Sequence, residues 1–456
     1  MKRKSLILSL TMLMATMLVI SGCAAKKTAE VAPPVGTDGY ASITTEALKE
    51  SISKPEWVVV DARQTDAFNG WKLDGLEKGG HIKGATDFSA LWLDVKGDTV
   101  AKRLAETLTV KGITPEKNVV LYDANGLDAK RVADYLKGLG YKNISLYDVK
   151  EWVKDSSLEM VSNKNYQMIV PAQWIKDVID GKNPETFAGG EYKIFEVSWG
   201  DETTSYVNGH IPNAVHINTD EEEKAPLWSL NSDAELIQFA KNNGITLNQT
   251  VILEGADPMA SYRVAAILKY LGVKDVRVLN GGFESWVRAG YEVEKVSHPK
   301  VAVADFGATE PQNKGYIINI DQAKAVLADK SNSILVDIRS WEEHIGAITG
   351  YSDLKFKGRP AGAVWGQAGT DPNHLESYRN VDNTMRNADE IVAMWAEQGI
   401  TTDKTLSFFC GSGWRAAEVE FMADSMGAEK ISMYANGWYE WSADSKNPVE
   451  IGEPKK

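Results

Sequence analysis

The pattern of apolar positions along the chain repeats three times. Each repeat has an apolar run that ends in a polar loop, and further on a second apolar run followed by a helical pattern. The first runs lie at 57–63, 192–198 and 333–339, and the second at 118–122, 250–254 and 405–409. Short apolar runs bounded by turn residues are typical of buried strands. Strands that alternate with helices predict α/β domains, each with a mostly parallel sheet flanked by helices.

The helices behind the second strands are expected at 129–139, 261–271 and 416–426, and a further short strand follows each helix. A chain of 456 residues is long enough for three domains at about 150 residues each. Breaks in the pattern near residues 158 and 300 place domain 1 at 40–158, domain 2 at 159–300 and domain 3 at 301–456.

The N-terminus has a different pattern. Residues 1–4 are basic, residues 6–20 are apolar, and the sequence Ile-Ser-Gly-Cys ends at Cys23. The apolar stretch is short for a membrane span and is typical of a secretory signal. Because the run ending at Cys23 resembles a bacterial lipobox, we predict a lipoprotein signal peptide at 1–22 and a flexible tether at 23–39. The protein would then be exported and lipid-anchored to the cell envelope, with an ordinary secretory signal as the alternative.

The net charge, the histidines and the cysteines limit the kinds of ligand and partner that the chain can bind. The formal net charge of −13 argues against nucleic acid, which requires a basic surface. The six histidines show no spacing typical of a metal site, so no metal is expected. The chain has two cysteines, Cys23 and Cys410. If Cys23 carries lipid, Cys410 has no disulfide partner and is a candidate reactive thiol.

Cys410 stands where a strand meets a glycine-rich turn and a helix. In such a turn, backbone N–H groups can point inward, and the following helix adds the positive end of its dipole. Both effects stabilise a thiolate. Arg415 would add a positive charge at the rim of the loop. The arrangement predicts a nucleophilic sulfur that meets a small anion.

Alignment of the repeats indicates which one can carry this chemistry. Cys410 corresponds to Asp123 in the first repeat and to Gly255 in the second, and neither repeat has a cation at the position of Arg415. An Asp at the centre of the loop would repel an anion. Domains 1 and 2 are therefore predicted to be inactive, and domain 3 is predicted to be catalytic.

These motifs resemble the rhodanese (sulfurtransferase) superfamily. They are the Asp-x-Arg strand ends, the G-x-x-x-G-A segments, and the strand that ends in cysteine before its loop. The resemblance covers essentially the whole mature chain, as three tandem rhodanese-like domains. Domain 3 resembles the catalytic domain of three-domain periplasmic thiosulfate sulfurtransferases. The segments that carry this likeness are 357–365, 383–386, 410–416 and 436–442.

The resemblance implies covalent, double-displacement catalysis without a cofactor. The Cys410 thiolate would take the outer sulfur of thiosulfate, release sulfite, and pass the sulfur from a persulfide to cyanide or a thiol. Arg415 and Arg339 would bind the anionic donor, although Arg339 can instead brace the loop through Asp337. The backbone N–H groups expected to stabilise the sulfur belong to Gly411, Ser412, Gly413, Trp414 and Arg415.

The site also allows other functional hypotheses. The loop begins like that of mercaptopyruvate sulfurtransferases but ends in Trp-Arg, and a second arginine after Arg339 is missing, so 3-mercaptopyruvate is the less favoured donor. A phosphatase loop would place five residues between cysteine and arginine, whereas four stand here. The alternative from another class is an envelope carrier of sulfur or another chalcogen, or a protein-binding module. Such a protein would show little turnover without an envelope protein partner.

Several recurrent or charged residues are assigned structural roles. His81 and His210 occupy matched positions in two repeats, so a structural role is expected for them in preference to metal binding. Trp286 and Trp441 are expected to be core anchors that close their domains. The acidic run at 221–223 is expected to be a solvated loop.

Overall fold

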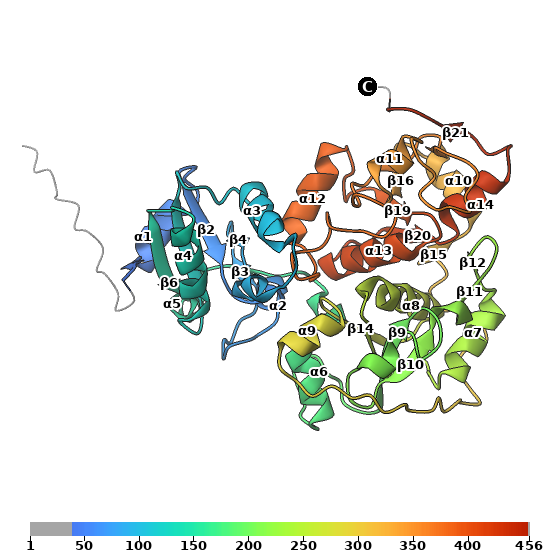
Figure 1. The fold of residues 1–456 in the computed structure, drawn as a ribbon, viewed down its shortest axis with the longest axis horizontal. Coiled ribbons are helices and arrows are strands. Elements are labelled where there is room, and N and C mark those ends of the chain that lie inside the picture. Colours follow the sequence, from blue (N-terminus) through green and yellow to red (C-terminus); the bar gives the residue numbers. More distant parts are fainter. Residues whose placement is uncertain (1–38, 455–456) are drawn as a thin grey trace, which may run out of the picture.

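A computed structural model describes residues 39–454, so the predictions for residues 1–38, including Cys23, lie outside the described range. Three five-stranded sheets follow one another along the chain (Figure 1). Every pair of neighbouring strands in these three sheets is parallel. The predicted α/β fold, with one mostly parallel sheet for each repeat, is confirmed.

The three sheets share one strand order, in which the second predicted strand is central. In domain 1 the order is β1 (Ala41–Ser42), β6 (Ile144–Asp148), β5 (Asn118–Asp123), β2 (Trp57–Asp61) and β4 (Thr86–Asp87). In domain 2 it is β8 (Ile169–Val170), β14 (Asp275–Leu279), β13 (Thr250–Glu254), β9 (Tyr192–Ser198) and β10 (Val215–Asn218). In domain 3 it is β15 (Ile317–Ile318), β20 (Ile431–Tyr434), β19 (Thr405–Phe409), β16 (Ser333–Asp337) and β18 (Val364–Trp365). The central strands are nearly all buried, because helices cover parallel sheets on both faces.

The helices of each domain flank its sheet. Domain 1 has α1 (Thr45–Ser51), α2 (Thr65–Asn69), α3 (Val100–Val110), α4 (Asp128–Gly138) and α5 (Val149–Lys154). Domain 2 has α6 (Ala172–Ile179), α7 (Asp233–Asn242), α8 (Pro258–Leu271) and α9 (Phe283–Arg288). Domain 3 has α10 (Ile320–Ala328), α11 (Trp341–His344), α12 (Ala388–Glu397), α13 (Trp414–Met426) and α14 (Gly437–Ala443). The predicted helices correspond to α4, α8 and α13.

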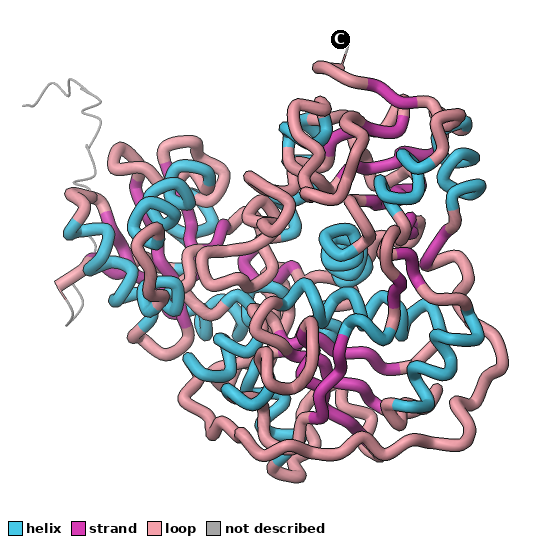
Figure 2. The backbone as a smooth tube through the Cα atoms, turned by 45° about the vertical axis from the view of Figure 1, so that its right-hand side comes forward, coloured by secondary structure: helices cyan, strands magenta, loops and turns pink. Residues whose placement is uncertain are grey.

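Short antiparallel pairs complete the domains. They are β3 (His81–Ile82) with β7 (Met160–Val161), β11 (Glu223–Lys224) with β12 (Ser229–Leu230), and β17 (Arg359–Pro360) with β21 (Val449–Glu450). Through β7, the chain stays with domain 1 slightly past the expected boundary at 158. The connection after domain 2, a long loop in Figure 2, runs along that domain, where Leu247 N–H donates to the Phe306 carbonyl.

Helices α8 and α13 pack against each other and join domain 2 to domain 3 (Figure 1). Nearly every side chain of both helices is buried. One continuous hydrophobic cluster runs from domain 2 into domain 3, whereas the sheet of domain 1 has cores of its own. Because α13 begins four residues after Cys410, this packing ties the loop that starts at Cys410 to domain 2.

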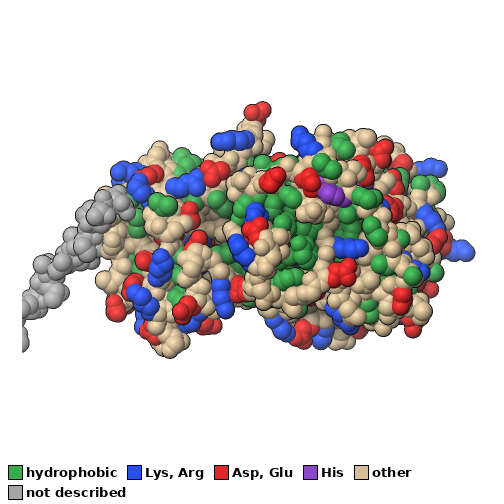
Figure 3. All heavy atoms as spheres, turned by 90° about the horizontal axis from the view of Figure 1, so that it is seen from below, with side chains coloured by type: hydrophobic (Ala, Val, Ile, Leu, Met, Phe, Trp, Pro, Cys, Tyr) green, Lys and Arg blue, Asp and Glu red, His purple; other side chains and the backbone are tan. Residues whose placement is uncertain are grey.

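The residues assigned structural roles lie in the interior. Trp286 and Trp441 are buried, and His81 and His210 are buried against Phe68 and Tyr206. On the face shown in Figure 3, basic and acidic side chains are interspersed and form no basic stripe over the described residues visible there. No helix among residues 39–454 is long and apolar enough to cross a membrane.

All three domains meet at Asn280. Its side-chain amide donates to Asp66 Oδ1 of domain 1 at 2.9 Å, and its Oδ1 accepts from the backbone N–H of Met385 of domain 3 at 2.8 Å. Burial raises the pKa of Asp66 from 3.8 to about 7; the hydrogen bond from Asn280 opposes this shift, and the nearby Asp382 adds to it.

This junction predicts a pH dependence of stability. The folded protein holds the Asp66 proton more tightly than the unfolded chain does, so protonated Asp66 stabilises the fold. This contribution to the free energy of unfolding is complete below about pH 4 and is lost as the pH rises towards about 7. Asp66→Asn should flatten that part of the curve of melting temperature against pH. The exposed Asp98→Asn in the same domain should leave it unchanged. Equal slopes in the wild type and in Asp66→Asn would contradict the assignment.

Candidate active site

Cys410 lies immediately after β19, at the start of the loop 410–415, here called the cysteine loop. Its side chain is only 1% exposed. The Gly413 N–H donates to Cys410 Sγ at 3.2 Å. Gly413 has φ +94°, a left-handed conformation that glycine adopts without strain, and α13 begins at the next residue. The N–H of Gly413 and the start of α13 thus lie beside the sulfur, as the sequence predicts.

Helix α14 fixes the cysteine loop from behind. Trp438 N–H donates to the Cys410 carbonyl at 2.9 Å, and Tyr439 N–H donates to the Gly411 carbonyl at 3.1 Å. A Cβ atom at Gly437 would lie 2.4 Å from the Cys410 oxygen, so only glycine allows this approach. With these two carbonyl groups held by α14, the backbone around the sulfur is locked in one conformation.

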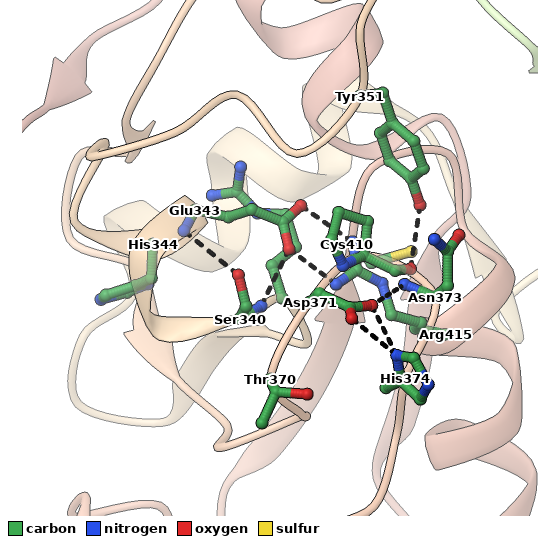
Figure 4. Close-up of polar contacts among 12 residues, drawn as sticks. Ser340, Glu343, His344, Tyr351, Thr370, Asp371, Asn373, His374, Cys410 and Arg415 are labelled. Carbon is green, nitrogen blue, oxygen red and sulfur yellow. Dashed lines mark hydrogen bonds and ion pairs between the residues drawn. The ribbon is translucent and has the colours of Figure 1, made fainter.

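Arg415 is buried beside Cys410, whereas the sequence analysis placed it at the rim (Figure 4). Its guanidinium donates to both carboxylate oxygens of Glu343, at 2.8 and 3.0 Å. Burial alone would raise the pKa of Glu343, but the charge of Arg415 outweighs it and lowers that pKa. The positive charge next to the sulfur is therefore part of a buried ion pair, and its contact with a donor remains a prediction.

Arg339 forms the brace that the sequence analysis named as its alternative role. Its guanidinium donates to both oxygens of Asp337, at 2.7 and 2.6 Å, and to the Gly358 carbonyl at 3.0 Å. Arg63 of domain 1 makes the same contacts with Asp61 and a glycine carbonyl, although no cysteine follows there. This brace is thus a feature of the repeat, and substrate contact by Arg339 also remains a prediction.

A cavity of 440 Å³ opens over the cysteine loop and is formed by two domains. Domain 3 contributes Tyr351, Asp353, Pro372, Asn373, Ser412, Trp414 and Tyr439. Domain 2 contributes Trp199, Glu223, Trp228, Asp257 and Met259. The wall is rich in aromatic rings and carboxylates, and domain 2, which lacks a nucleophile of its own, supplies about half of it.

Tyr351 closes the cavity on the side of Gly411. A Cβ atom at Gly411 would lie 2.5 Å from Cε2 of the Tyr351 ring, so this ring rests directly on the cysteine loop. Burial raises the pKa of Tyr351 to about 12, although Arg415 opposes the shift. The hydroxyl therefore remains protonated at neutral pH, and it donates to the Pro372 carbonyl at 3.4 Å.

The expectation that residues 221–223 form a solvated loop is wrong. Glu222 is 0% exposed and Glu223 is 8% exposed. The segment folds onto domain 3, where Trp414 Nε1 donates to Glu223 Oε2 at 3.1 Å and Leu230 N–H donates to Asn436 Oδ1 at 3.0 Å. A run of acidic residues favours solvent when judged alone, but here a second domain covers it.

Arg263 is the main residue that the sequence analysis missed. It lies on α8 of domain 2, is 0% exposed, and approaches Glu222 to 3.4 Å and Glu223 to 3.5 Å. A Cβ atom at Gly413 would lie 2.3 Å from Arg263 Nη1, so the guanidinium sits against the cysteine loop. Burial raises the pKa of Glu222 to about 8, although Arg263 lowers it. The available signal was an arginine within the mostly apolar sequence of α8.

Comparison with known proteins identifies this architecture. The sequence matches the rhodanese-like domain at residues 44–155, 172–289 and 319–444. The chain belongs to the rhodanese family. Thiosulfate sulfurtransferase YnjE of Escherichia coli K12 is 38% identical over 432 residues, which are 94% of each chain. The sulfur carrier protein TtuD of Thermus thermophilus is 27% identical over 300 residues, 63% of this chain and 98% of its own length.

Solved structures agree with this assignment. The wild-type structure of EanB superimposes with a TM-score of 0.86 at 35% identity, covering 92% of this chain and 100% of that one. The anaerobic ergothioneine biosynthesis enzyme of Chlorobium limicola, solved with its natural substrate trimethyl histidine, has the same score and identity over 91% of this chain and 100% of its own. A further EanB structure holds a cysteine persulfide with ergothioneine. These rhodanese relatives support a rhodanese-type sulfurtransferase with three rhodanese-like domains.

The contact between Arg263 and the cysteine loop can be tested by substitution. Arg263→Gln removes the buried cation that faces Glu222 and Glu223, and its loss should lower the melting temperature. We expect kcat/KM for sulfur transfer to fall at least about tenfold, since donors to a reacting anion must be held precisely.

Lys269→Gln on the same helix is the matched control, because Lys269 pairs at 3.0 Å with the partly exposed Asp424, away from the loop. It should change neither stability nor kcat/KM appreciably. Full activity in folded Arg263→Gln would show that the cysteine loop holds its geometry without domain 2.

Proposed function

We propose that this protein is a thiosulfate sulfurtransferase that carries sulfur through a persulfide on Cys410. The observation that carries the proposal is the cysteine sulfur itself, which accepts the Gly413 N–H at the start of α13, below a cavity shared by two domains. The likeness to YnjE, a thiosulfate sulfurtransferase that matches over 94% of each chain, supports the proposal.

The reaction has two displacements. The Cys410 thiolate attacks the outer sulfur of thiosulfate; the sulfur–sulfur bond of the donor breaks, and sulfite leaves with the electron pair. A cyanide or thiol acceptor then attacks the outer sulfur of the persulfide and releases the thiolate. No oxidant, reductant or cofactor is required. The N–H of Gly413 and the helix dipole of α13 stabilise the negative sulfur in each state.

The chemistry of the cavity wall favours a second candidate acceptor. The carboxyl groups of Glu223, Asp257 and Asp353 line the cavity together with the rings of Trp228 and Tyr439. Aromatic rings and carboxylates together suit a quaternary ammonium group. Since trimethyl histidine is the natural substrate of the related Chlorobium enzyme, we propose a trimethylammonium heteroaromatic compound as the alternative sulfur acceptor.

A sulfur-carrier role is the remaining alternative. The likeness to the carrier protein TtuD favours it, as does the inactivity proposed for domains 1 and 2. A carrier and an enzyme would both form the Cys410 persulfide. They differ in turnover, because a carrier passes its sulfur on only when an envelope protein partner is present.

We also propose that the protein is exported and lipid-anchored to the cell envelope through Cys23. The basic and apolar residues 1–20, followed by the lipobox-like run, support this proposal. Incorporation of labelled palmitate in cells, lost in Cys23→Ser, is the expected result. Equal labelling of both proteins would reject Cys23 as the lipid site.

Sulfur transfer from thiosulfate to cyanide, followed as thiocyanate, tests the proposed enzyme. We expect steady turnover by the wild type and none by Cys410→Ser, because the hydroxyl cannot form a persulfide. Ser407→Ala is the matched control: Ser407 lies on the same strand, is buried, and contacts Ser432 at 2.6 Å. It should retain activity, since it leaves the cysteine loop intact.

Replacing cyanide by trimethyl histidine separates the two acceptors. Faster single-turnover decay of the persulfide with trimethyl histidine than with cyanide or a thiol would favour the second candidate. Persulfide formation that never leads to turnover with any small acceptor would favour the carrier. A folded wild type with a free thiol that forms no persulfide from thiosulfate would reject thiosulfate as the donor.

A further inference from the structure

A second group of polar side chains converges in domain 2, apart from the cysteine loop. One ligand atom each of His210, Glu294 and His298 lies within 4.8 Å of the other two. His298 Nε2 is 2.9 Å from Glu294 Oε2, and His210 Nε2 is 4.0 Å from the same oxygen. His210 is completely buried, whereas the side chains of Glu294 and His298 are 25% and 30% exposed.

The ring of His210 is oriented as a metal ligand would be. Its Nδ1 lies 2.8 Å from the Tyr206 carbonyl oxygen, and the ring stacks on Tyr206 with the centroids 3.7 Å apart. Because a carbonyl oxygen only accepts, Nδ1 must carry the proton, which leaves Nε2 with a lone pair. This Nε2 is buried and has no hydrogen-bond partner among the described residues. Histidine ligands of metals are typically held by such a bond at the other nitrogen.

The backbone around the group is preorganised. His210 and Glu294 exchange two backbone hydrogen bonds of 2.9 Å. Glu294 Oε2 accepts from the N–H of Asn213 at 2.7 Å, and the N–H of His298 donates to the Tyr206 hydroxyl at 3.0 Å. The three ligand atoms are therefore brought together by the fold and do not depend on an ion for their approach.

The other two domains show what is particular to domain 2. Domain 1 has His81 at the matched position, with the same kind of ring stack, but its strand partner is the apolar Val161. Domain 3 has Arg359 there, which pairs directly with Glu450 at 3.2 Å. Domain 1 thus has the histidine but no carboxylate opposite it. In domain 3 the carboxylate of Glu450 pairs with Arg359, which is always charged. Only in domain 2, among the described residues, does a buried histidine nitrogen face a carboxylate and a second histidine.

We propose that His210, Glu294 and His298 bind a divalent transition-metal ion, with Zn²⁺ as the first choice. Two imidazole nitrogens and one carboxylate oxygen suit zinc, with water in the fourth position on the exposed side. Metal–ligand distances of about 2.0–2.2 Å place tetrahedral ligand atoms about 3.3–3.5 Å apart. The observed separations of 2.9 and 4.0 Å lie on either side of that value. The ion would tie residue 298, which leads into the interdomain connection, to the body of domain 2.

No metal site is expected from the sequence, because His210 lies far from Glu294 and His298 along the chain. The proposal does not depend on the function of Cys410. Its test therefore uses a chain that carries Cys410→Ser, so that the thiolate cannot serve as a ligand. Titration with Co²⁺ should produce visible absorption bands of a tetrahedral or five-coordinate ion, and Zn²⁺ should displace them with one ion per chain.

Glu294→Gln and His298→Gln, each made in the same background, should weaken Co²⁺ binding at least about tenfold. Both positions are partly exposed, so these variants should fold without metal. Added Zn²⁺ should raise the melting temperature of the parent protein and not that of either variant. His374→Gln is the matched control, since His374 pairs with Asp371 at 2.7 Å on the surface and has no third ligand.

Two results would overturn the proposal. One is the absence of both the Co²⁺ bands and a Zn²⁺-dependent rise in melting temperature in the parent protein. The other is metal binding that His374→Gln weakens as much as Glu294→Gln does, because the ion would then be held by scattered surface groups.

Discussion

The packing of α8 on α13 is the interaction on which the active site depends. Helix α13 begins at the cysteine loop and carries its N-terminal dipole to the sulfur, so the position of that helix fixes the position of the chemistry. Helix α8 belongs to a domain without a nucleophile, yet it holds α13 through a shared core and sets Arg263 against Gly413. The proposed catalytic unit therefore comprises domains 2 and 3 together, although Cys410 belongs to domain 3.

Helix α13 carries several buried charged side chains. Arg415 is matched by Glu343, and Glu418 on the same helix accepts two hydrogen bonds from Arg379. Glu420 has no hydrogen-bond partner among the described residues, and burial raises its pKa well above the usual value. Buried pairs of this kind contribute little net stability but are costly to break. Arg379 also pairs with Asp257 of domain 2 at 3.2 Å, so this buried network reaches the second domain that lines the cavity over the cysteine loop.

Much of this fold could be predicted because each repeat carries its own local signals. Continuous apolar runs identified the central strands, and the glycine-rich turn after the 405–409 run identified Cys410 and the start of α13. Contacts between domains leave no such signal in a single sequence. The burial of Glu222 and the approach of Arg263 depend on how one domain lies against another, and the ion pair of Arg415 joins it to Glu343, which is distant in the sequence of the same domain. The prediction of a solvated loop at 221–223 is wrong for this reason. Its charges indicate exposure to solvent, because its contact with domain 3 cannot be seen in the sequence.

Mass spectrometry of the intact protein after reaction with thiosulfate tests the central claim most directly. The account predicts an added mass of one sulfur atom, localised by peptide mapping to Cys410 and removed by cyanide. Folded protein with a free Cys410 thiol that gains no sulfur, or gains it at another residue, would contradict the account.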